Sequence, residues 1–193
     1  MPLFVVPRDR PGTLALSPAP RGGGDLDADV AAFVAAGVTD VVCLLPDAEL
    51  GRLGLADEPQ ALVRTGIAVH RLPVPDFGVP APEPAAVLAD VVAGRLAQGA
   101  HVVVHCRGGI GRSSTVAALV LVREGLAPDD AWRVLSAARG RRVPETAAQE
   151  RFVARAAGVA APATPVARRV VEAAGAVLAR AVGSVVDVVR RRG

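Results

Sequence analysis

One stretch near the middle of the chain limits the fold more than any other. Residues 102–104 are three consecutive valines, as expected for a strand that is covered on both faces. The sequence then reads HCRGGIGRSS, in which Gly108, Gly109 and Gly111 allow backbone conformations that other residues resist. We therefore predict a buried strand, a tight turn whose N–H groups converge on one point, and the first turn of a helix.

Converging N–H groups in front of a helix N-terminus form an anion site. Cys106 lies at the mouth of this site, where its thiol should ionise below the usual value of about 8.5. Arg112 can bind two phosphate oxygens with its forked guanidinium, and Ser113 places a hydroxyl near the sulfur. These residues predict phosphoryl transfer to sulfur. The alternative is an ordinary strand–turn–helix with an inert buried cysteine.

The pattern H-C-x-x-x-x-x-R-S resembles the signature of the protein-tyrosine phosphatase superfamily. The flanking sequence, over about residues 10–157, is similar to the small dual-specificity branch, with its kinase-associated phosphatases and bacterial relatives. This resemblance implies a cysteine-phosphatase fold and a phosphocysteine intermediate on Cys106. It also implies that phosphate is bound by the backbone of Arg107, Gly108, Gly109, Ile110, Gly111 and Arg112.

The resemblance implies further roles for the two residues beside this loop. Ser113 would stabilise the thiolate and assist breakdown of the intermediate, although it could also act as a helix N-cap. His105 would be a buried hydrogen-bonding support that tunes the loop and the sulfur. A lone histidine on a strand could equally be a satisfied core residue.

A phosphatase of this class also needs a general acid for the leaving oxygen, and Asp76 is the candidate. It lies in the stretch PVPDFGVP, thirty residues before Cys106, between a predicted strand and a predicted helix. A general acid contributes about 10²- to 10⁴-fold to the rate. The alternatives are an ordinary turn aspartate at position 76 and Asp90, which lies within a helical pattern.

Two more residues have open interpretations. Gln149 fits the glutamine that places water in the second step of related enzymes, or it is a surface helix residue. Cys43 lies on a predicted strand that should neighbour the central one, so its sulfur could approach Cys106. Some family members protect their nucleophile with such a disulfide, but we favour a buried small hydrophobic residue.

Strands alternate with helices along the chain. We predict strands at 3–6, 13–16, 38–45 and 67–72 besides the central one, and helices at 26–36, 59–65, 85–98, 113–124, 128–139 and 144–157. This order predicts an α/β fold with a central, mostly parallel sheet flanked by helices. Cys106 would then lie at the carboxyl end of a strand, where ligands bind.

We place a phosphatase domain at residues 1–160, and a linker and amphipathic helical extension at 161–193. The apolar face of 166–192 needs a partner. Three partners stay open, namely the catalytic domain itself, a second copy, and a membrane surface. The membrane is least favoured because aromatic anchors are missing from this segment.

Composition narrows the partners of this 193-residue chain. All 22 basic residues besides histidine are Arg, but the net charge is only +3 and no Arg-rich patch with interleaved aromatics is present, which argues against nucleic-acid binding. The three His lack zinc spacing, so we expect no metal and no cofactor. Two Cys in a chain of this length indicate a reducing compartment, and we expect a cytoplasmic protein.

The loop also bears on the substrate. Relatives that act on phosphoinositides carry lysines inside this loop, whereas this chain has Arg107 and Ile110. The expected substrate is a phosphorylated protein, with phosphotyrosine first and phosphoserine or phosphothreonine left open. The alternatives are a phosphate-binding pseudophosphatase and a rhodanese-like sulfurtransferase.

Overall fold

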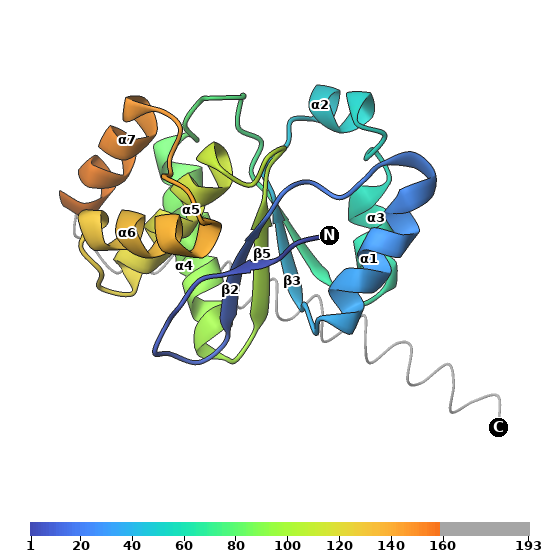
Figure 1. The fold of residues 1–193 in the computed structure, drawn as a ribbon, viewed down its shortest axis with the longest axis horizontal. Coiled ribbons are helices and arrows are strands. Elements are labelled where there is room, and N and C mark those ends of the chain that lie inside the picture. The colour runs from blue at the N-terminus through green and yellow to red at the C-terminus, as the bar shows by residue number, and fades with distance from the viewer. Residues whose placement is uncertain (159–193) are drawn as a thin grey trace. The chain divides into compact units, whose positions relative to one another are not determined.

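The computed structural model describes residues 1–158, which fold around a five-stranded sheet (Figure 1). The strands lie in the order β1-β2-β5-β3-β4. Their bounds are Phe4–Val5 for β1, Thr13–Ser17 for β2, Asp40–Cys43 for β3, Ala68–Arg71 for β4 and His101–His105 for β5. Only β1 is antiparallel to its neighbour, so the prediction of a mostly parallel sheet is confirmed.

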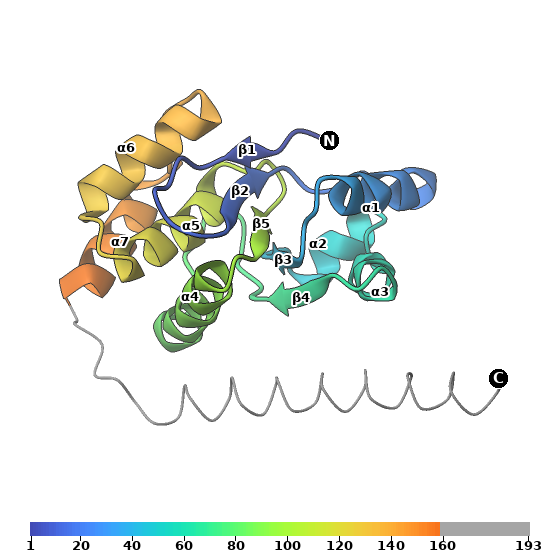
Figure 2. The same ribbon diagram turned by 90° about the horizontal axis from the view of Figure 1, so that it is seen from below.

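Helices cover both faces of this sheet, as Figure 2 shows from below. One group consists of α1 (Leu26–Ala35), α2 (Asp47–Arg52) and α3 (Glu58–Arg64), preceded by a 3-10 turn at Gly23–Asp25. The other consists of α4 (Pro82–Ala97), α5 (Gly111–Arg123), α6 (Pro128–Arg139) and α7 (Ala147–Gly158). No helix within residues 1–158 is both long enough and apolar enough to cross a membrane.

The central strand β5 separates two hydrophobic clusters. Val102 and Val104 pack in the cluster that contains α4 and α5, whereas Val103 packs in the cluster that contains α1 and α3. All three valines are buried, which explains why the strand is continuously apolar instead of alternating. The loop after β5 therefore starts from a strand that is packed on both faces of the sheet.

Several helix boundaries differ from the predicted ones. α4 begins at Pro82, before the predicted start at 85, because proline suits the first turn of a helix. α7 begins at Ala147, so the predicted start at Pro144 is wrong. Thr146 and Gln149 form a capping box, in which Thr146 Oγ1 accepts the N–H of Gln149 and Gln149 Oε1 accepts the N–H of Thr146. The predictions for 161–193, including the helix and its self-association through 166–192, lie outside the described residues.

Candidate active site

The loop from Cys106 to Gly111 joins β5 to α5, and its three glycines serve different purposes. Gly109 has φ +65°, and a Cβ there would lie 2.5 Å from the carbonyl of Ser17. Gly111 has no left-handed backbone, but a Cβ there would collide with the side chain of Glu145. Gly108 shows neither constraint, because its Cβ would meet only Ile110 at ordinary contact distance. The sequence argument about backbone freedom thus holds for Gly109 alone.

Cys106 lies at the base of this loop and is 3% exposed. Its Sγ is 3.5 Å from Oγ of Ser113, the third residue of α5. Burial raises the pKa of the Cys106 thiol, but the Ser113 hydroxyl, the backbone N–H groups of Ser113 and Ile110 and the charge of Arg112 together lower it below its ordinary value. The structure therefore favours a thiolate at this position.

Arg112 is buried beside the loop and is held from three directions. Its two terminal nitrogens donate to Glu49 of α2 at 2.8 and 3.1 Å, and Nη1 also donates to the carbonyl of Val74. Its Nη2 lies 2.9 Å from Oδ1 of Asp76. The hydrogen bonds from Arg112 lower the pKa of Glu49, which keeps this carboxylate charged. Sequence reasoning missed Glu49, which is 63 residues from Arg112 in the chain.

Asp76 lies on the loop between β4 and α4, and its side chain is 45% exposed. The next residue, Phe77, has φ +57° and is 60% exposed. A non-glycine residue in this conformation is uncommon, and such residues cluster at functional sites. The competitor Asp90 pairs with Arg123, the last residue of α5, about 18 Å along the helix from the loop. The structure thus brings Asp76 to Arg112 and leaves Asp90 remote.

Gln149 is fully buried, so its reading as a surface helix residue is wrong. Besides its part in the capping box, Gln149 accepts the N–H of Glu145 and donates from Nε2 to the carbonyl of Gly78 at 3.0 Å. Gly78 belongs to the same loop as Asp76, so Gln149 connects α7 to the candidate acid. The motif T-x-x-Q is a recognisable capping signal in the sequence, whereas the contact with Gly78 joins positions 71 residues apart.

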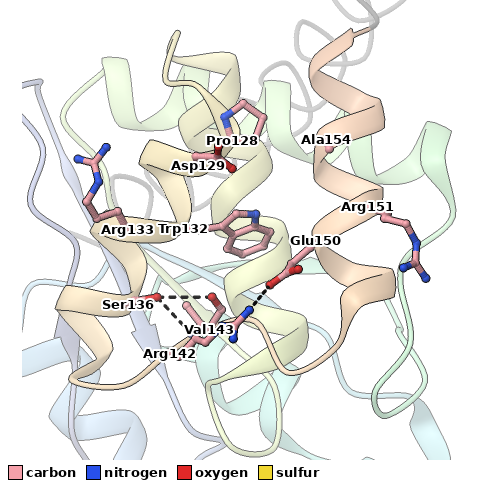
Figure 3. A pocket seen from close by; sticks show the side chains of 10 residues that line it. All are labelled: Pro128, Asp129, Trp132, Arg133, Ser136, Arg142, Val143, Glu150, Arg151 and Ala154. Atoms are coloured by element: carbon pink, nitrogen blue, oxygen red, sulfur yellow. Dashed lines mark hydrogen bonds and ion pairs between the residues drawn. The ribbon is translucent and has the colours of Figure 1, made fainter.

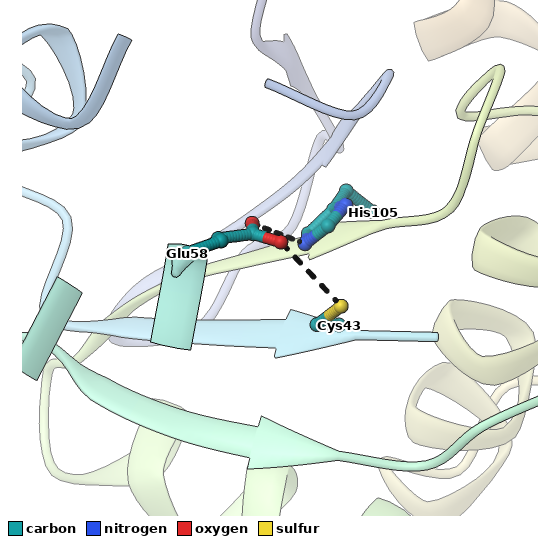
Figure 4. Close-up of side chains that lie close together, drawn as sticks. All are labelled: Cys43, Glu58 and His105. Carbon is teal, nitrogen blue, oxygen red and sulfur yellow. Dashed lines mark hydrogen bonds and ion pairs between the residues drawn. The ribbon is translucent and has the colours of Figure 1, made fainter. Parts of the chain in front are cut away.

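His105 and Cys43 lie on the opposite side of the sheet from Cys106. Cys43 belongs to the hydrophobic cluster around α1 and α3, and Cys106 belongs to the other cluster. β3 does neighbour β5, as predicted, but the two cysteine side chains are separated by the sheet. His105 and Cys43 instead meet Glu58, the first residue of α3 (Figure 4). Within residues 1–158, these three side chains form the one group whose ligand atoms could together hold a metal ion.

Arg139, at the end of α6, supports the phosphate loop from outside. Its Nε donates to the carbonyl of Gly109 at 2.6 Å and its Nη2 donates to the carbonyl of Gly108 at 3.0 Å. The guanidinium stacks 3.8 Å from the ring centre of Phe4 on β1. Because these carbonyls are held outward, the N–H groups of the same peptides can face the centre of the loop. Sequence reasoning missed Arg139, whose contact with Gly109 spans 30 residues.

A groove leads away from the loop that carries Asp76. Its first part is a hollow of about 490 Å³ lined by Phe77, Arg141, Arg142, Pro144, Glu145, Thr146, Ala147 and Glu150. A second hollow of about 460 Å³ lies between α6 and α7 and shares Arg142 and Glu150 with the first (Figure 3). Trp132 lies in this second part, and an ion pair joins Arg142 to Glu150. The rim beside the candidate site is thus rich in guanidinium groups.

A phosphate loop with a thiolate at its base, a buried arginine and a nearby carboxylic acid defines the class of cysteine-dependent phosphatases. A family model described as "Swiss Army Knife protein, DSP-PTPase phosphatase domain" matches residues 10–161. The chain therefore belongs to this family, within the dual-specificity branch of the protein-tyrosine phosphatase superfamily.

Individual relatives agree with this assignment. The chain is 26% identical over 131 residues to cyclin-dependent kinase inhibitor 3 of Rattus norvegicus and 27% identical over 118 residues to that of Mus musculus. These matches cover 67% and 61% of this chain but only 62% and 56% of the relatives, less than two thirds of their length.

Solved structures show the same fold. Tk-PTP in its active form is 28% identical, with a TM-score of 0.63 over 80% of this chain and 97% of that protein. Kinase associated phosphatase, solved with its catalytic-site cysteine replaced by serine, is 21% identical, with a TM-score of 0.67 over 73% of this chain and 83% of that protein.

Proposed function

We propose that this protein hydrolyses phosphomonoesters on proteins, phosphotyrosine first, through a phosphocysteine intermediate on Cys106. The observation that carries the proposal is the contact between Arg112 and Asp76 beside a thiol whose pKa is lowered. A nucleophile, a cation and an acid around one phosphate-sized loop would support this reaction. Family membership supports a phosphatase activity.

In the first step, the Cys106 thiolate attacks phosphorus and forms the P–S bond. The P–O bond to the leaving group breaks, and Asp76, in its protonated form, gives its proton to that oxygen. Arg112 and the backbone N–H groups of residues 107–112 stabilise the charge that builds up on the other oxygens. Glu49 keeps the guanidinium of Arg112 in place because it holds both terminal nitrogens.

In the second step, water attacks phosphorus, the P–S bond breaks and the Cys106 thiolate leaves. Asp76, now a carboxylate, takes the proton of the water. The Ser113 hydroxyl, whose Oγ lies 3.5 Å from Sγ of Cys106, donates a hydrogen bond to the departing thiolate. This contact supports the role proposed for Ser113. Gln149 is proposed to orient the water, because its carboxamide lies between Gly78 of the acid loop and Gly111.

Several observations support a protein substrate. The groove beyond Phe77 offers Arg141 to the residues that flank a phosphorylated side chain, whereas its Arg142 pairs with Glu150. Two of the relatives found are named for an association with kinases. PTPMT1, which shares the fold, has been solved with PI(5)P, so this lipid is the competing substrate. Because the mechanism needs a free thiolate, we place the reaction in the reducing environment of the cytoplasm.

The test compares four substrates under identical conditions, namely p-nitrophenyl phosphate, a phosphotyrosine peptide, PI(5)P and thiosulfate. We expect turnover of the first two, and Cys106→Ser should abolish turnover while it retains peptide binding. Turnover of thiosulfate alone would assign a sulfurtransferase. Hydrolysis by Cys106→Ser within tenfold of the wild-type rate would exclude the proposed mechanism.

A further inference from the structure

Behind the phosphate loop lies a cluster of three buried polar side chains that the proposed mechanism does not use. Glu58 and His105 are 0% exposed and Cys43 is 1% exposed. Nε2 of His105 lies 2.9 Å from Oε1 of Glu58, and the Cys43 thiol donates to Oε2 of Glu58 at 3.7 Å. Figure 4 shows Glu58 reaching from α3 toward the ring of His105 at the end of β5, with Cys43 on β3 close by.

In such a cluster, an ion pair without net charge costs less free energy than a single buried charge. A buried carboxylate without a positive partner would cost on the order of several kcal/mol of desolvation. Burial lowers the pKa of His105, but Cys43 and Glu58 raise it more, to about 10. Glu58 also begins α3, where a helix N-terminus favours a negative charge. The contact with Glu58 therefore favours a protonated His105 at neutral pH.

Among residues 1–158, the titratable side chains that face His105 are those of Glu58 and Cys43. Glu58 comes from α3 and Cys43 from β3, and Cys106 is the next residue in the chain. On the other side of β5, β2 places Ser17 opposite His105 in register, and serine does not titrate in this range. Among the described residues, neither ring nitrogen of His105 makes a contact of full hydrogen-bond geometry, so the 2.9 Å approach of Nε2 to Glu58 is an ionic contact. The charge of the imidazole thus depends on Glu58 and Cys43.

The distances favour this ion pair over a metal site. In a tetrahedral zinc site, a nitrogen and an oxygen ligand lie about 3.3 Å apart, and four ligands are required. Here the nitrogen and oxygen are 2.9 Å apart, and three ligands are present among residues 1–158. The cluster is built as a direct contact between opposite charges.

We propose that Glu58 is a positioning residue of the active site. Its ion pair keeps His105 protonated behind the phosphate loop, and this fixed positive charge stabilises the Cys106 thiolate and an incoming phosphate. The proposal rests on the proposed function only in taking Cys106 as the reactive thiol. His105 and Cys106 are adjacent in the chain but face opposite sides of the sheet, so the charge acts on the sulfur through the packed interior, where screening is weaker than in water.

The test measures the thiol itself rather than turnover. Iodoacetamide is neutral, and mass spectrometry of the peptide that carries Cys106 gives its alkylation rate as a function of pH. We expect Glu58→Gln to raise the pKa of Cys106, so that alkylation on the acid side becomes about threefold to tenfold slower, since one pKa unit is tenfold in thiolate.

Asp40→Asn is the matched control. Asp40 is a buried carboxylate on β3 that pairs with His70 and Arg95 at the other end of the sheet. Its loss should reduce stability but leave the alkylation curve of Cys106 unchanged. An equal shift in Asp40→Asn and Glu58→Gln, or no shift in folded Glu58→Gln, would overturn the proposal.

Nitrogen NMR of the imidazole in the wild-type protein measures the protonation state of His105 directly, even if Glu58→Gln does not fold. We expect His105 to be doubly protonated at pH 7 to 8, which is well below its pKa of about 10. In a folded Glu58→Gln variant, we expect His105 to be neutral. A neutral His105 in wild type at pH 7 would contradict the proposal, as would one bound equivalent of zinc that Glu58→Gln loses. These results do not depend on any substrate, so they are independent of the phosphatase test.

Discussion

At the scale of single residues, Arg112 connects the parts of the site. It touches Asp76 of the acid loop, Glu49 of α2 and the carbonyl of Val74, and its charge lowers the pKa of Cys106. A side chain with so many fixed partners is held in one orientation. The following predictions depend on this arrangement.

Asp76→Ala should lower kcat about 10²-fold or more for a phosphotyrosine peptide, whose leaving group needs a proton. The loss should be much smaller for p-nitrophenyl phosphate, whose leaving group departs readily as an anion. Steady-state kinetics on both substrates measure this difference. The same loss on both would indicate a structural role, and Asp90→Ala should behave as wild type because Asp90 pairs with Arg123.

Gly109→Ala should damage the phosphate loop more than Gly108→Ala. The Gly109 backbone is left-handed, and a Cβ would lie 2.5 Å from the backbone of Ser17. We expect vanadate binding to weaken at least about tenfold in Gly109→Ala, as measured by titration. Equal binding by the two variants would show that the loop tolerates a side chain at both positions.

The residues that the sequence identified most directly lie close together in the chain. Cys106, Arg112 and Ser113 share one short segment, so their spacing alone predicts a phosphate site. Glu49, Glu58 and Arg139 join the site only through contacts between distant segments. A charged residue on a short helix has no local signal that distinguishes a buried partner from a solvated one.

At the scale of elements, the acid loop is attached to α7 through Gln149. The hydrogen bond from Gln149 to the carbonyl of Gly78 and the capping box at 146–149 make the start of α7 part of the site. Strands and helices were predictable because valine runs and glycine stops are local features. The boundary at Ala147 was not predicted, because Pro144 also suits the first turn of a helix.

Gln149→Ala should slow the second chemical step more than the first. Without the carboxamide, the acid loop loses its bond to α7 and the attacking water loses its proposed partner. We expect kcat to fall about tenfold, the equivalent of one hydrogen bond of about 1.4 kcal/mol. Stopped-flow assays with p-nitrophenyl phosphate should then show a burst of p-nitrophenol before the steady state. Slower turnover without a burst would limit Gln149 to a structural role.

At the scale of the whole described domain, the two ends of the sheet carry different charged groups. The carboxyl ends of the strands lead to the phosphate loop. The opposite end of the sheet carries Asp40, which contacts His70 and Arg95. Burial raises the pKa of Asp40, but its bonds from His70, Arg95 and Thr39 lower it far below the usual range. This ionic cluster is remote from the loop and should contribute to stability alone.

Asp40→Asn should lower the free energy of unfolding by about 2–3 kcal/mol at pH 7, below the 3–5 kcal/mol of a wholly buried pair because Arg95 is partly exposed. A carboxylate with a lowered pKa stabilises the fold above about pH 4 and loses this contribution as the pH falls below that value. Urea denaturation of both proteins between pH 7 and pH 3 should therefore show a shrinking difference. A difference that stays constant with pH would show that the charge of Asp40 is not the cause.

The phosphocysteine on Cys106 is the central claim, and it can be measured directly. The enzyme is mixed with p-nitrophenyl phosphate, denatured within milliseconds and digested, and the peptides are examined by mass spectrometry. We predict a phosphate adduct on the peptide that carries Cys106, increased in Gln149→Ala and absent in Cys106→Ser. Turnover with no adduct, or an adduct on another residue, would contradict the account.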